Sequence, residues 1–256
     1  MPAGLRRWTT DWPRRLAPAV LDPVLHALLP SSCALCGELA GTVLCPSCRA
    51  RYAASHTLRC PCCANPLADG EDAGRHCGAC LAEPPAFDAT VVAVDYAAPL
   101  DALVLDLKFG AQLPLAPLFG QLLRDAILAR PGWVLPDVLC PVPLGPRRLV
   151  ERGFNQALEI ARPLAAALGV ALQPRLAARA VDTAAQSGVS PRERARNIRG
   201  AFDVPANMLH LAHGRHVGVV DDVMTSGHTL NELAATLKAA GAARVSNLVF
   251  ARTPPH

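Results

Sequence analysis

The chain has 256 residues, of which 51% are hydrophobic and 4% aromatic, and its formal net charge is +4. This length accommodates one large domain or two smaller ones, and the composition is typical of a compact α/β protein. No apolar run is long enough to cross a bilayer, so we expect no membrane span.

Residues 1–30 combine an arginine-rich start with a modest apolar run from Leu16 to Leu29. Prolines and Asp22 interrupt this run, and no small-residue cleavage site follows it. We therefore expect a short amphipathic segment rather than a signal peptide, and a cytoplasmic protein.

Four Cys-x-x-Cys pairs occupy the next stretch, and we predict a double zinc ribbon over residues 31–84. In a chain without an export signal, this spacing indicates structural Zn²⁺ rather than disulfides. Two pairs supply the four thiolates of one tetrahedral site. The predicted ligands are Cys33, Cys36, Cys45, Cys48, Cys60, Cys63, Cys77 and Cys80.

The simplest pairing joins the first two Cys-x-x-Cys pairs around one ion and the last two around another, although an interleaved pairing also satisfies the spacing. Cys62 is best explained as a bystander, and Cys140 as a small core residue. His56 and His76 could replace a thiolate, but solvent-exposed histidines are the simpler interpretation.

Residues 85–256 read as one domain of alternating strands and helices. The predicted strands are 87–96, 134–142, 216–220 and 244–250, and the predicted helices are 100–108, 116–128, 156–168 and 230–240. This alternation predicts a parallel sheet flanked by helices, with ligands bound beyond the carboxyl ends of the strands. Pro163 interrupts the third helix and predicts a kink.

Arginine is concentrated between Arg147 and Arg199, where ten arginines face four acids. A guanidinium group binds pyrophosphate through two parallel hydrogen bonds, and it also attracts a nucleic-acid backbone. A solvated face in a chain that uses arginine almost exclusively as its cation would look the same.

The most informative stretch runs from Val219 to Thr229, where a buried strand leads through Asp221 and Asp222 to small hydroxyl residues and a helix. Backbone N–H groups at a helix N-terminus favour a phosphate, and the hydroxyls of this loop can add donors. Ionised carboxylates only accept hydrogen bonds, which suits ribose hydroxyls or hydrated Mg²⁺. The simpler alternative is an ordinary turn whose hydroxyls cap the helix.

Together these motifs resemble the ComF family. The resemblance rests on the double zinc ribbon, the segments 107–110, 141–144 and 152–156, and the loop 221–229, which resembles the 5-phosphoribosyl-1-pyrophosphate (PRPP) loop of type I phosphoribosyltransferases. It spans the chain from about Leu25 to Phe250. It implies a type I phosphoribosyltransferase-like parallel sheet with a small N-terminal zinc-ribbon domain.

The resemblance also implies roles for individual residues. Asp221 and Asp222 would meet the ribose hydroxyls and Mg²⁺ of PRPP, and the loop after them would cradle its 5-phosphate. The segment from Arg179 to Phe202 would form a hood over the site. The implied PRPP-binding residues are Thr225, Ser226, Gly227, His228, Thr229, Arg147, Arg148, Arg152 and Lys108.

Two of these assignments have simple structural alternatives. The segment Arg152–Gln156 could cap the following helix instead of binding an anion, since Asn155 is a favoured cap residue. Lys108 could be a solvated charge at a helix end.

Three functions are compatible with these residues. The first is an enzyme that transfers or hydrolyses phosphoribosyl groups, and the residues leave open whether catalysis occurs. The second, implied by the family resemblance, is an accessory protein of natural competence that binds incoming single-stranded DNA and works with other competence proteins. The third is a sensor that binds PRPP without consuming it.

Overall fold

The computed structural model describes residues 31–53, 57–68, 74–179 and 200–254. The chain divides into two compact units, residues 1–45 and 46–256. The predictions made for residues 1–30, for His56 and for hood residues 180–199 lie outside the described residues.

The described part of the first unit is a small antiparallel ribbon. Strands β1 (Ser31–Ser32) and β2 (Leu39–Ala40) pair with each other. The turn between them places Gly37 at a φ of +74°, a conformation that glycine adopts without steric cost.

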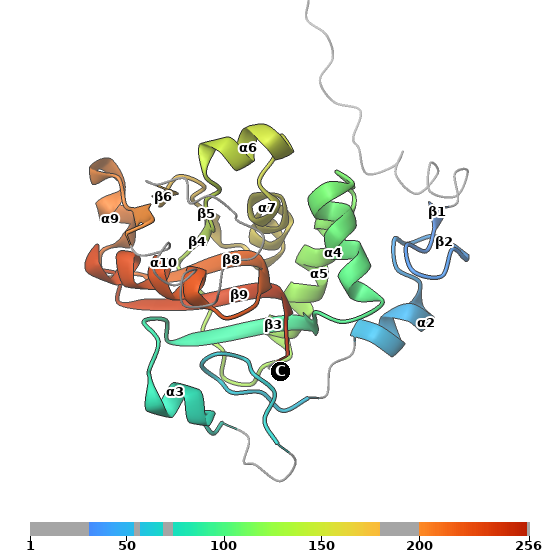
Figure 1. Cartoon of the computed structure of the whole chain (residues 1–256), viewed down its shortest axis with the longest axis horizontal. Helices are drawn as coiled ribbons and strands as arrows, with labels where there is room; N and C mark the ends of the chain where they lie inside the picture. The colour runs from blue at the N-terminus through green and yellow to red at the C-terminus, as the bar shows by residue number, and fades with distance from the viewer. Residues whose placement is uncertain (1–30, 54–56, 69–73, 180–199, 255–256) are drawn as a thin grey trace, which may run out of the picture. The chain divides into compact units, whose positions relative to one another are not determined.

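The second unit is built on a five-stranded parallel sheet with the order β3-β9-β8-β4-β5 (Figure 1). Its strands are β3 (Ala89–Asp95), β4 (Val138–Pro141), β5 (Ala171–Leu172), β8 (His216–Met224) and β9 (Arg244–Arg252). Strand β8 lies in the middle of the sheet, between β9 and β4. This confirms the predicted parallel sheet.

Helices cover both faces of the sheet. The long helices are α4 (Leu100–Phe109), α5 (Leu115–Leu128), α7 (Gln156–Leu168) and α10 (His228–Ala239). Side chains of consecutive strand residues point to opposite faces. In β9, Val249 joins the apolar cluster of α10, whereas the ring of Phe250 stacks on Phe119 of α5 with centroids 3.6 Å apart. Helices α5 and α7, which contact each other, therefore lie opposite α10.

Shorter elements connect these layers. They are α2 (Pro46–Cys48), the π-helix Arg49–Ala53, α3 (Gly78–Ala82), α6 (Pro146–Arg152), β6 (Ala178–Arg179), β7 (Phe202–Asp203), the 3-10 turn Ala206–Met208 and α9 (Leu209–Ala212). Strands β6 and β7 form an antiparallel pair. No helix in the described ranges has both the length and the apolar character required to span a membrane.

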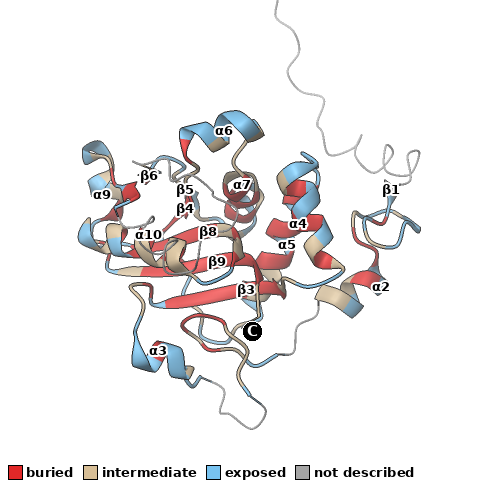
Figure 2. Ribbon diagram, viewed as in Figure 1, coloured by how far each residue is buried: buried red, intermediate tan, exposed pale blue. Residues whose placement is uncertain are grey.

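The second half of the zinc-ribbon region shares the core of the sheet domain. Cys60, Cys63 and Cys80 are buried in the same cluster as Val219 of β8 and Leu233 of α10. Figure 2 shows the loop that carries the first of these cysteines as a buried segment beside β3. This half of the ribbon is part of the hydrophobic core rather than an appendage.

Three elements differ from the predictions. Strand β8 continues to Met224 rather than ending at Val220, because β9 continues to pair with it through Val223 and Met224. Strand β4 begins only at Val138, after Pro136. Helix α7 runs through Pro163 as one element, and the proline ring lies against Gly120 of α5, where a Cβ would meet its Cγ at 3.0 Å.

The close packing of β8 predicts the effect of one added methyl group. A Cβ on Gly218 would lie 2.6 Å from Pro136 Cγ and 2.7 Å from Leu139 Cδ2. We expect Gly218→Ala to lower the free energy of unfolding by about 1–3 kcal/mol in urea titrations. Gly41→Ala, where nothing lies within 4 Å, is the control and is expected to be neutral. Equal effects of the two variants would contradict the packing described for β8.

Candidate functional site

Asp221 and Asp222 lie near the carboxyl end of β8, and Asp222 contacts a lysine from α4. Asp222 is buried, and its Oδ2 lies 3.0 Å from Nζ of Lys108 at the end of α4. Asp221 is half-buried and accepts a hydrogen bond from the backbone N–H of Asp222 at 2.9 Å. Lys108 is therefore held in an ion pair with Asp222 rather than left as a solvated charge at a helix end.

The surroundings of Asp221 disfavour its ionised form. Burial, followed by the negative charge of Asp222, raises the pKa of Asp221 to about 8, although the Lys108 ammonium acts in the opposite direction. A cation that binds beside the two carboxylates would offset their repulsion and stabilise the ionised form of Asp221. This is the electrostatic condition expected of a Mg²⁺ or ribose-hydroxyl site.

The loop after β8 leaves the start of α10 open. Gly227 is the N-cap residue, and among the residues that the structure describes no side chain makes a capping hydrogen bond there. Its φ of +80° lies in the left-handed region, which glycine adopts without the strain that a side chain would add. Thr225 and Ser226 are exposed, and Ser226 Oγ lies 2.8 Å from Nδ1 of His228. The alternative in which these hydroxyls cap the helix is therefore not what the structure shows.

The three arginines of α6 differ in their partners and in their exposure. Arg147 donates to Glu151 at 3.0 Å on the exposed surface of α6, and Arg148 is half-buried. The Arg152 guanidinium lies over the ring of Phe109, 5.4 Å from its centroid. Phe109 directly follows Lys108 in the chain. Thus Arg152 lies near the lysine side of the site, whereas Arg147 is drawn toward Glu151.

Asn155 has a capping role. Its Oδ1 accepts from the backbone N–H of Ala157 at 3.0 Å and of Leu158 at 3.4 Å, and its Nδ2 donates to the carbonyl of Val142 at 3.0 Å. The alternative in which this segment caps the next helix is correct for Asn155. The same bonds fix the end of β4 to the start of α7.

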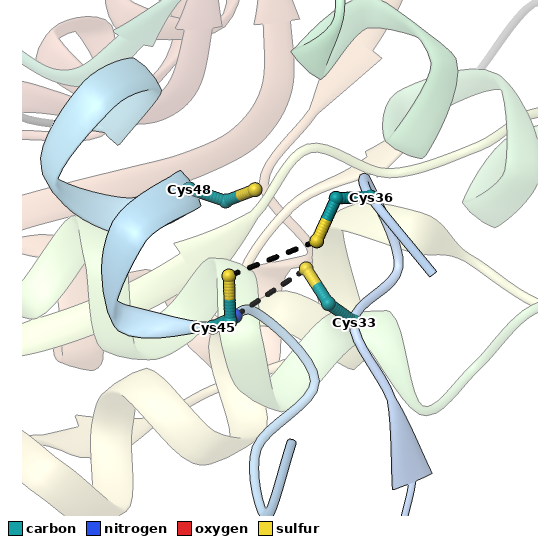
Figure 3. Close-up of side chains that lie close together, drawn as sticks. All are labelled: Cys33, Cys36, Cys45 and Cys48. Carbon is teal, nitrogen blue, oxygen red and sulfur yellow. Dashed lines mark hydrogen bonds between the residues drawn. The ribbon is translucent and has the colours of Figure 1, made fainter. Parts of the chain in front are cut away.

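The first cysteine cluster consists of Cys33, Cys36, Cys45 and Cys48, whose thiols converge in Figure 3. All four Sγ atoms lie within 4.8 Å of one another, and Cys36 Sγ lies 3.8 Å from Cys45 Sγ. Thiolates about 2.3 Å from a tetrahedral Zn²⁺ are about 3.8 Å apart. Backbone N–H donors outweigh burial and lower the pKa of Cys33 to about 6, which favours the thiolate that zinc requires.

The second cluster consists of Cys60, Cys63, Cys77 and Cys80 and has the same geometry. Cys63 Sγ lies 3.5 Å from Cys77 Sγ, and the backbone N–H of Cys77 donates to Cys60 Sγ at 3.3 Å. The structure thus groups the eight cysteines as in the simplest pairing, and none of the ten cysteines forms a disulfide. Both donor sets fit Zn²⁺.

The two remaining cysteines have different surroundings. Burial raises the pKa of Cys62 to about 11 and that of Cys140 to about 12, so both thiols stay protonated near neutral pH. Cys62 Sγ points to the carbonyl of Phe87 at 3.8 Å. Their positions agree with a bystander and a core residue.

One residue of the site region was missed by the sequence predictions. Arg252 ends β9, is 5% exposed, and donates to the carbonyls of Met224 and Thr225 at the start of the loop. The predicted strand stopped at Phe250 and so left it out. A charged residue at the end of an otherwise apolar strand is the signal that could have identified it.

Comparisons with known proteins agree with this arrangement. Residues 24–81 match the model of the double zinc ribbon domain, and residues 155–255 match that of the phosphoribosyl transferase domain. A protein named DNA utilization protein YhgH from Salmonella typhi is 37% identical over 226 residues, which cover 82% of this chain and 97% of that protein.

A second relative is more distant. Competence protein F from Haemophilus influenzae is 33% identical over 182 residues, or 70% of this chain and 79% of that protein. Among solved structures, the glutamine PRPP amidotransferase from B. subtilis is 20% identical with a TM-score of 0.33, over 52% of this chain and 25% of that one.

The cysteine geometry predicts the zinc content of variants. We expect the purified protein to hold about two Zn²⁺ per chain by elemental analysis, because each cluster supplies a complete tetrahedral set. Cys33→Ser and Cys77→Ser should each reduce the content to about one. Cys62→Ser and Cys140→Ser are the matched controls, and a loss of zinc from either would contradict the assignment of ligands.

The environment of Asp221 predicts how stability changes with pH. Its folded pKa of about 8 lies above its ordinary value of 3.8, so the folded state binds more protons between these values. Stability should therefore fall as pH rises across this window and level off above it. We expect Asp221→Asn to flatten this dependence and to raise the free energy of unfolding at pH 8 by about 1 kcal/mol or more, measured in urea.

Asp222→Asn provides the comparison for this prediction. It leaves the Lys108 ammonium without its carboxylate partner, so we expect a loss of about 1 kcal/mol rather than a gain. An Asp221→Asn protein with the wild-type dependence on pH would show that Asp221 is not the group that titrates.

Proposed function

The chain belongs to the ComF family, and from that premise we propose that the carboxyl end of β8 binds PRPP together with Mg²⁺. The observation that carries the proposal is the Lys108–Asp222 ion pair of 3.0 Å beside Asp221, directly before the open N-terminus of α10. A cation, two acids and a phosphate-binding turn then lie within one short stretch of the fold. The match to the phosphoribosyl transferase domain supports the same ligand.

The 5-phosphate would bind at the turn between β8 and α10. The N-terminal N–H groups of a helix have no partner within the helix, and no side chain in the described ranges caps those of α10. Thr225, Ser226 and Thr229 supply hydroxyl donors, and His228 is held by Ser226. Gly227 allows the backbone to make the turn without a side chain filling the space near Met224.

The ribose hydroxyls and Mg²⁺ would be bound by Asp221 and Asp222. Their oxygens accept hydrogen bonds and suit a hard cation. Mg²⁺, when bound with PRPP, neutralises part of the pyrophosphate charge. Lys108 keeps Asp222 in place and adds a positive charge on the side where Arg152 lies. Arg148 and Arg147 of α6 are the further cations available for the pyrophosphate.

These residues favour the chemistry of a phosphoribosyltransferase that positions a substrate rather than attacks it. Departure of pyrophosphate requires stabilisation of its charge, for which Lys108 and the arginines are suited. An acceptor would enter from the side of the predicted hood, most of which lies outside the described residues. The same site would serve a sensor if no acceptor binds.

The proposed ligand is tested by calorimetric titration of PRPP with Mg²⁺ into the whole protein. We expect a dissociation constant in the micromolar range, weakened at least about 100-fold in Asp221→Asn/Asp222→Asn because both acceptors lose their charge. Asp106→Asn, on the exposed side of α4, is the matched control and should bind normally. Equal binding by all three proteins would place PRPP elsewhere, and no binding by any would remove the proposal.

A second function, binding of single-stranded DNA, is favoured by one separate observation. Phe109 is 71% exposed, and one face of its ring carries the Arg152 guanidinium. An exposed ring beside a cation is a platform on which a base can stack. Relatives named as a DNA utilization protein and a competence protein support a role with DNA in this chain. A cytoplasmic location is the corresponding proposal, since eight zinc-binding thiolates require a reducing compartment.

Fluorescence anisotropy with a labelled oligothymidine tests this second function. We expect Phe109→Ala to weaken binding by about tenfold, since one stacked base contributes about 1–3 kcal/mol. Arg147→Ala/Arg148→Ala should weaken binding and reduce its dependence on salt. Asp222→Asn is the control that removes the PRPP site. Retained DNA binding in Asp222→Asn would separate the two functions, and an unchanged affinity in Phe109→Ala would exclude the platform.

A further inference from the structure

Arg252 makes hydrogen bonds to two parts of the protein, the second zinc cluster and the loop after β8. It is the last residue of β9, opposite Met224 of β8 and Asp95 of β3, and only 5% of it is exposed. A buried guanidinium is costly unless its N–H groups are bonded. The hydrogen-bond partners of Arg252 therefore show which segments it holds together.

The first set of partners belongs to the second zinc cluster. Arg252 Nε donates to the carbonyl of Cys63 at 3.3 Å, and Nη2 donates to Oδ1 of Asn65. Between them, Ala64 has a φ of +57°, and its N–H bonds the carbonyl of Cys60 at 2.9 Å. This tight turn brings Cys60 and Cys63 to one metal.

The second set of partners lies at the start of the phosphate loop. Arg252 Nη1 donates to the carbonyl of Met224 at 3.0 Å and also to that of Thr225. The Met224 carbonyl accepts in addition from the N–H of Thr253 at 3.0 Å. A guanidinium is planar and rigid, so its orientation on the zinc side determines its orientation on the loop side.

We propose that Arg252 is a positioning residue through which zinc at Cys60, Cys63, Cys77 and Cys80 orders the loop from Met224 to Gly227. With Zn²⁺ held by these cysteines, the turn around Ala64 would be fixed; this turn orients the guanidinium, and the guanidinium holds the two loop carbonyls. Four thiolates outweigh the charge of one Zn²⁺, so the loaded site is anionic and favours a buried cation beside it. The consequence for PRPP rests on the proposed function, whereas the ordering of the loop does not.

Arg130 offers a matched comparison within the same fold. Its guanidinium also joins the ribbon to the sheet domain, by donating to the carbonyl of Thr90 at 2.7 Å and to that of Pro61 at 3.3 Å. Both of these bonds are remote from Met224 and Thr225 in the ladder, since Thr90 lies near the start of β3. Loss of Arg130 therefore removes two bonds between the ribbon and the sheet domain, but no bond of Arg252 or of the loop.

Hydrogen exchange of the full-length, zinc-loaded protein tests the connection. The informative amides are those of Asn231 and Thr253, which bond the carbonyls of Gly227 and Met224. We expect exchange of these amides to accelerate about tenfold or more in Arg252→Gln, with about two zinc ions retained, and to stay unchanged in Arg130→Gln. Arg252→Lys keeps the charge but cannot bridge both sides, so it should exchange like Arg252→Gln and is the variant to use if the latter does not fold.

Removal of the metal completes the test. Cys77→Ser, which opens the second cluster, should accelerate exchange at the same two amides, and Arg252→Gln/Cys77→Ser should add nothing further. Additive effects, equal effects of Arg130→Gln and Arg252→Gln, or unchanged exchange in Arg252→Gln would each overturn the connection.

A titration with PRPP and Mg²⁺ separates this inference from the proposed function. We expect Arg252→Gln to weaken PRPP binding about tenfold, and Arg130→Gln to leave it unchanged. If the wild-type protein does not bind PRPP, the proposed function fails, and the exchange data still decide whether zinc orders the loop. If PRPP binds equally to both variants while exchange differs, the loop is ordered by Arg252 but does not limit binding, which overturns the proposed consequence for PRPP.

Discussion

The ion pair between Lys108 and Asp222 is the interaction on which the rest of the site depends. Beyond Val220 strand β8 pairs with β9, and Asp222 is buried there, so its carboxylate has little water to stabilise it. Two consecutive carboxylates repel each other there, and burial together with Asp222 raises the pKa of Asp221. Lys108, contributed by α4, offsets part of this charge.

The architecture joins this acidic end to a region that favours anions. Because β8 runs directly into the turn before α10, the carboxylates and the open helix N-terminus are separated by only a few residues. A ligand with hydroxyls at one end and a phosphate at the other complements this order. PRPP, the proposed ligand, has both groups, so a single strand-to-helix connection would account for most of the proposed recognition.

The second zinc cluster takes part in this arrangement through the core of the sheet domain. Its cysteines pack with residues of β8 and α10, and Arg252 links its backbone to the loop. Metal binding to such a small ribbon supplies free energy of folding that its few apolar side chains cannot. A reducing and zinc-replete environment would then be a condition for an ordered phosphate loop as well as for an ordered ribbon.

Local patterns in the sequence were sufficient to predict the parallel sheet and to single out the loop after β8. The spacing of the cysteines also predicted the two clusters, because each Cys-x-x-Cys pair has a fixed geometry. The capping role of Asn155 remained one of two alternatives, since a cap and an anion ligand use the same residue types.

Contacts between distant residues could not be predicted in this way. Nothing in the segment around Lys108 specifies that its ammonium reaches Asp222, and the pairing of Arg147 with Glu151 depends on how α6 presents both. The length of β8 depends on continued pairing with β9. For the same reason Arg252 was missed, because its role appears only when β8, β9 and the zinc turn are seen together.

The central claim is that the end of β8 and the start of α10 form one site for PRPP and Mg²⁺. A crystal structure of the protein grown with both ligands tests it most directly. The account predicts the 5-phosphate on the backbone N–H groups of residues 225–229 and the ribose hydroxyls at Asp221 and Asp222. PRPP bound at any other surface, with this loop empty at saturating ligand, would contradict it.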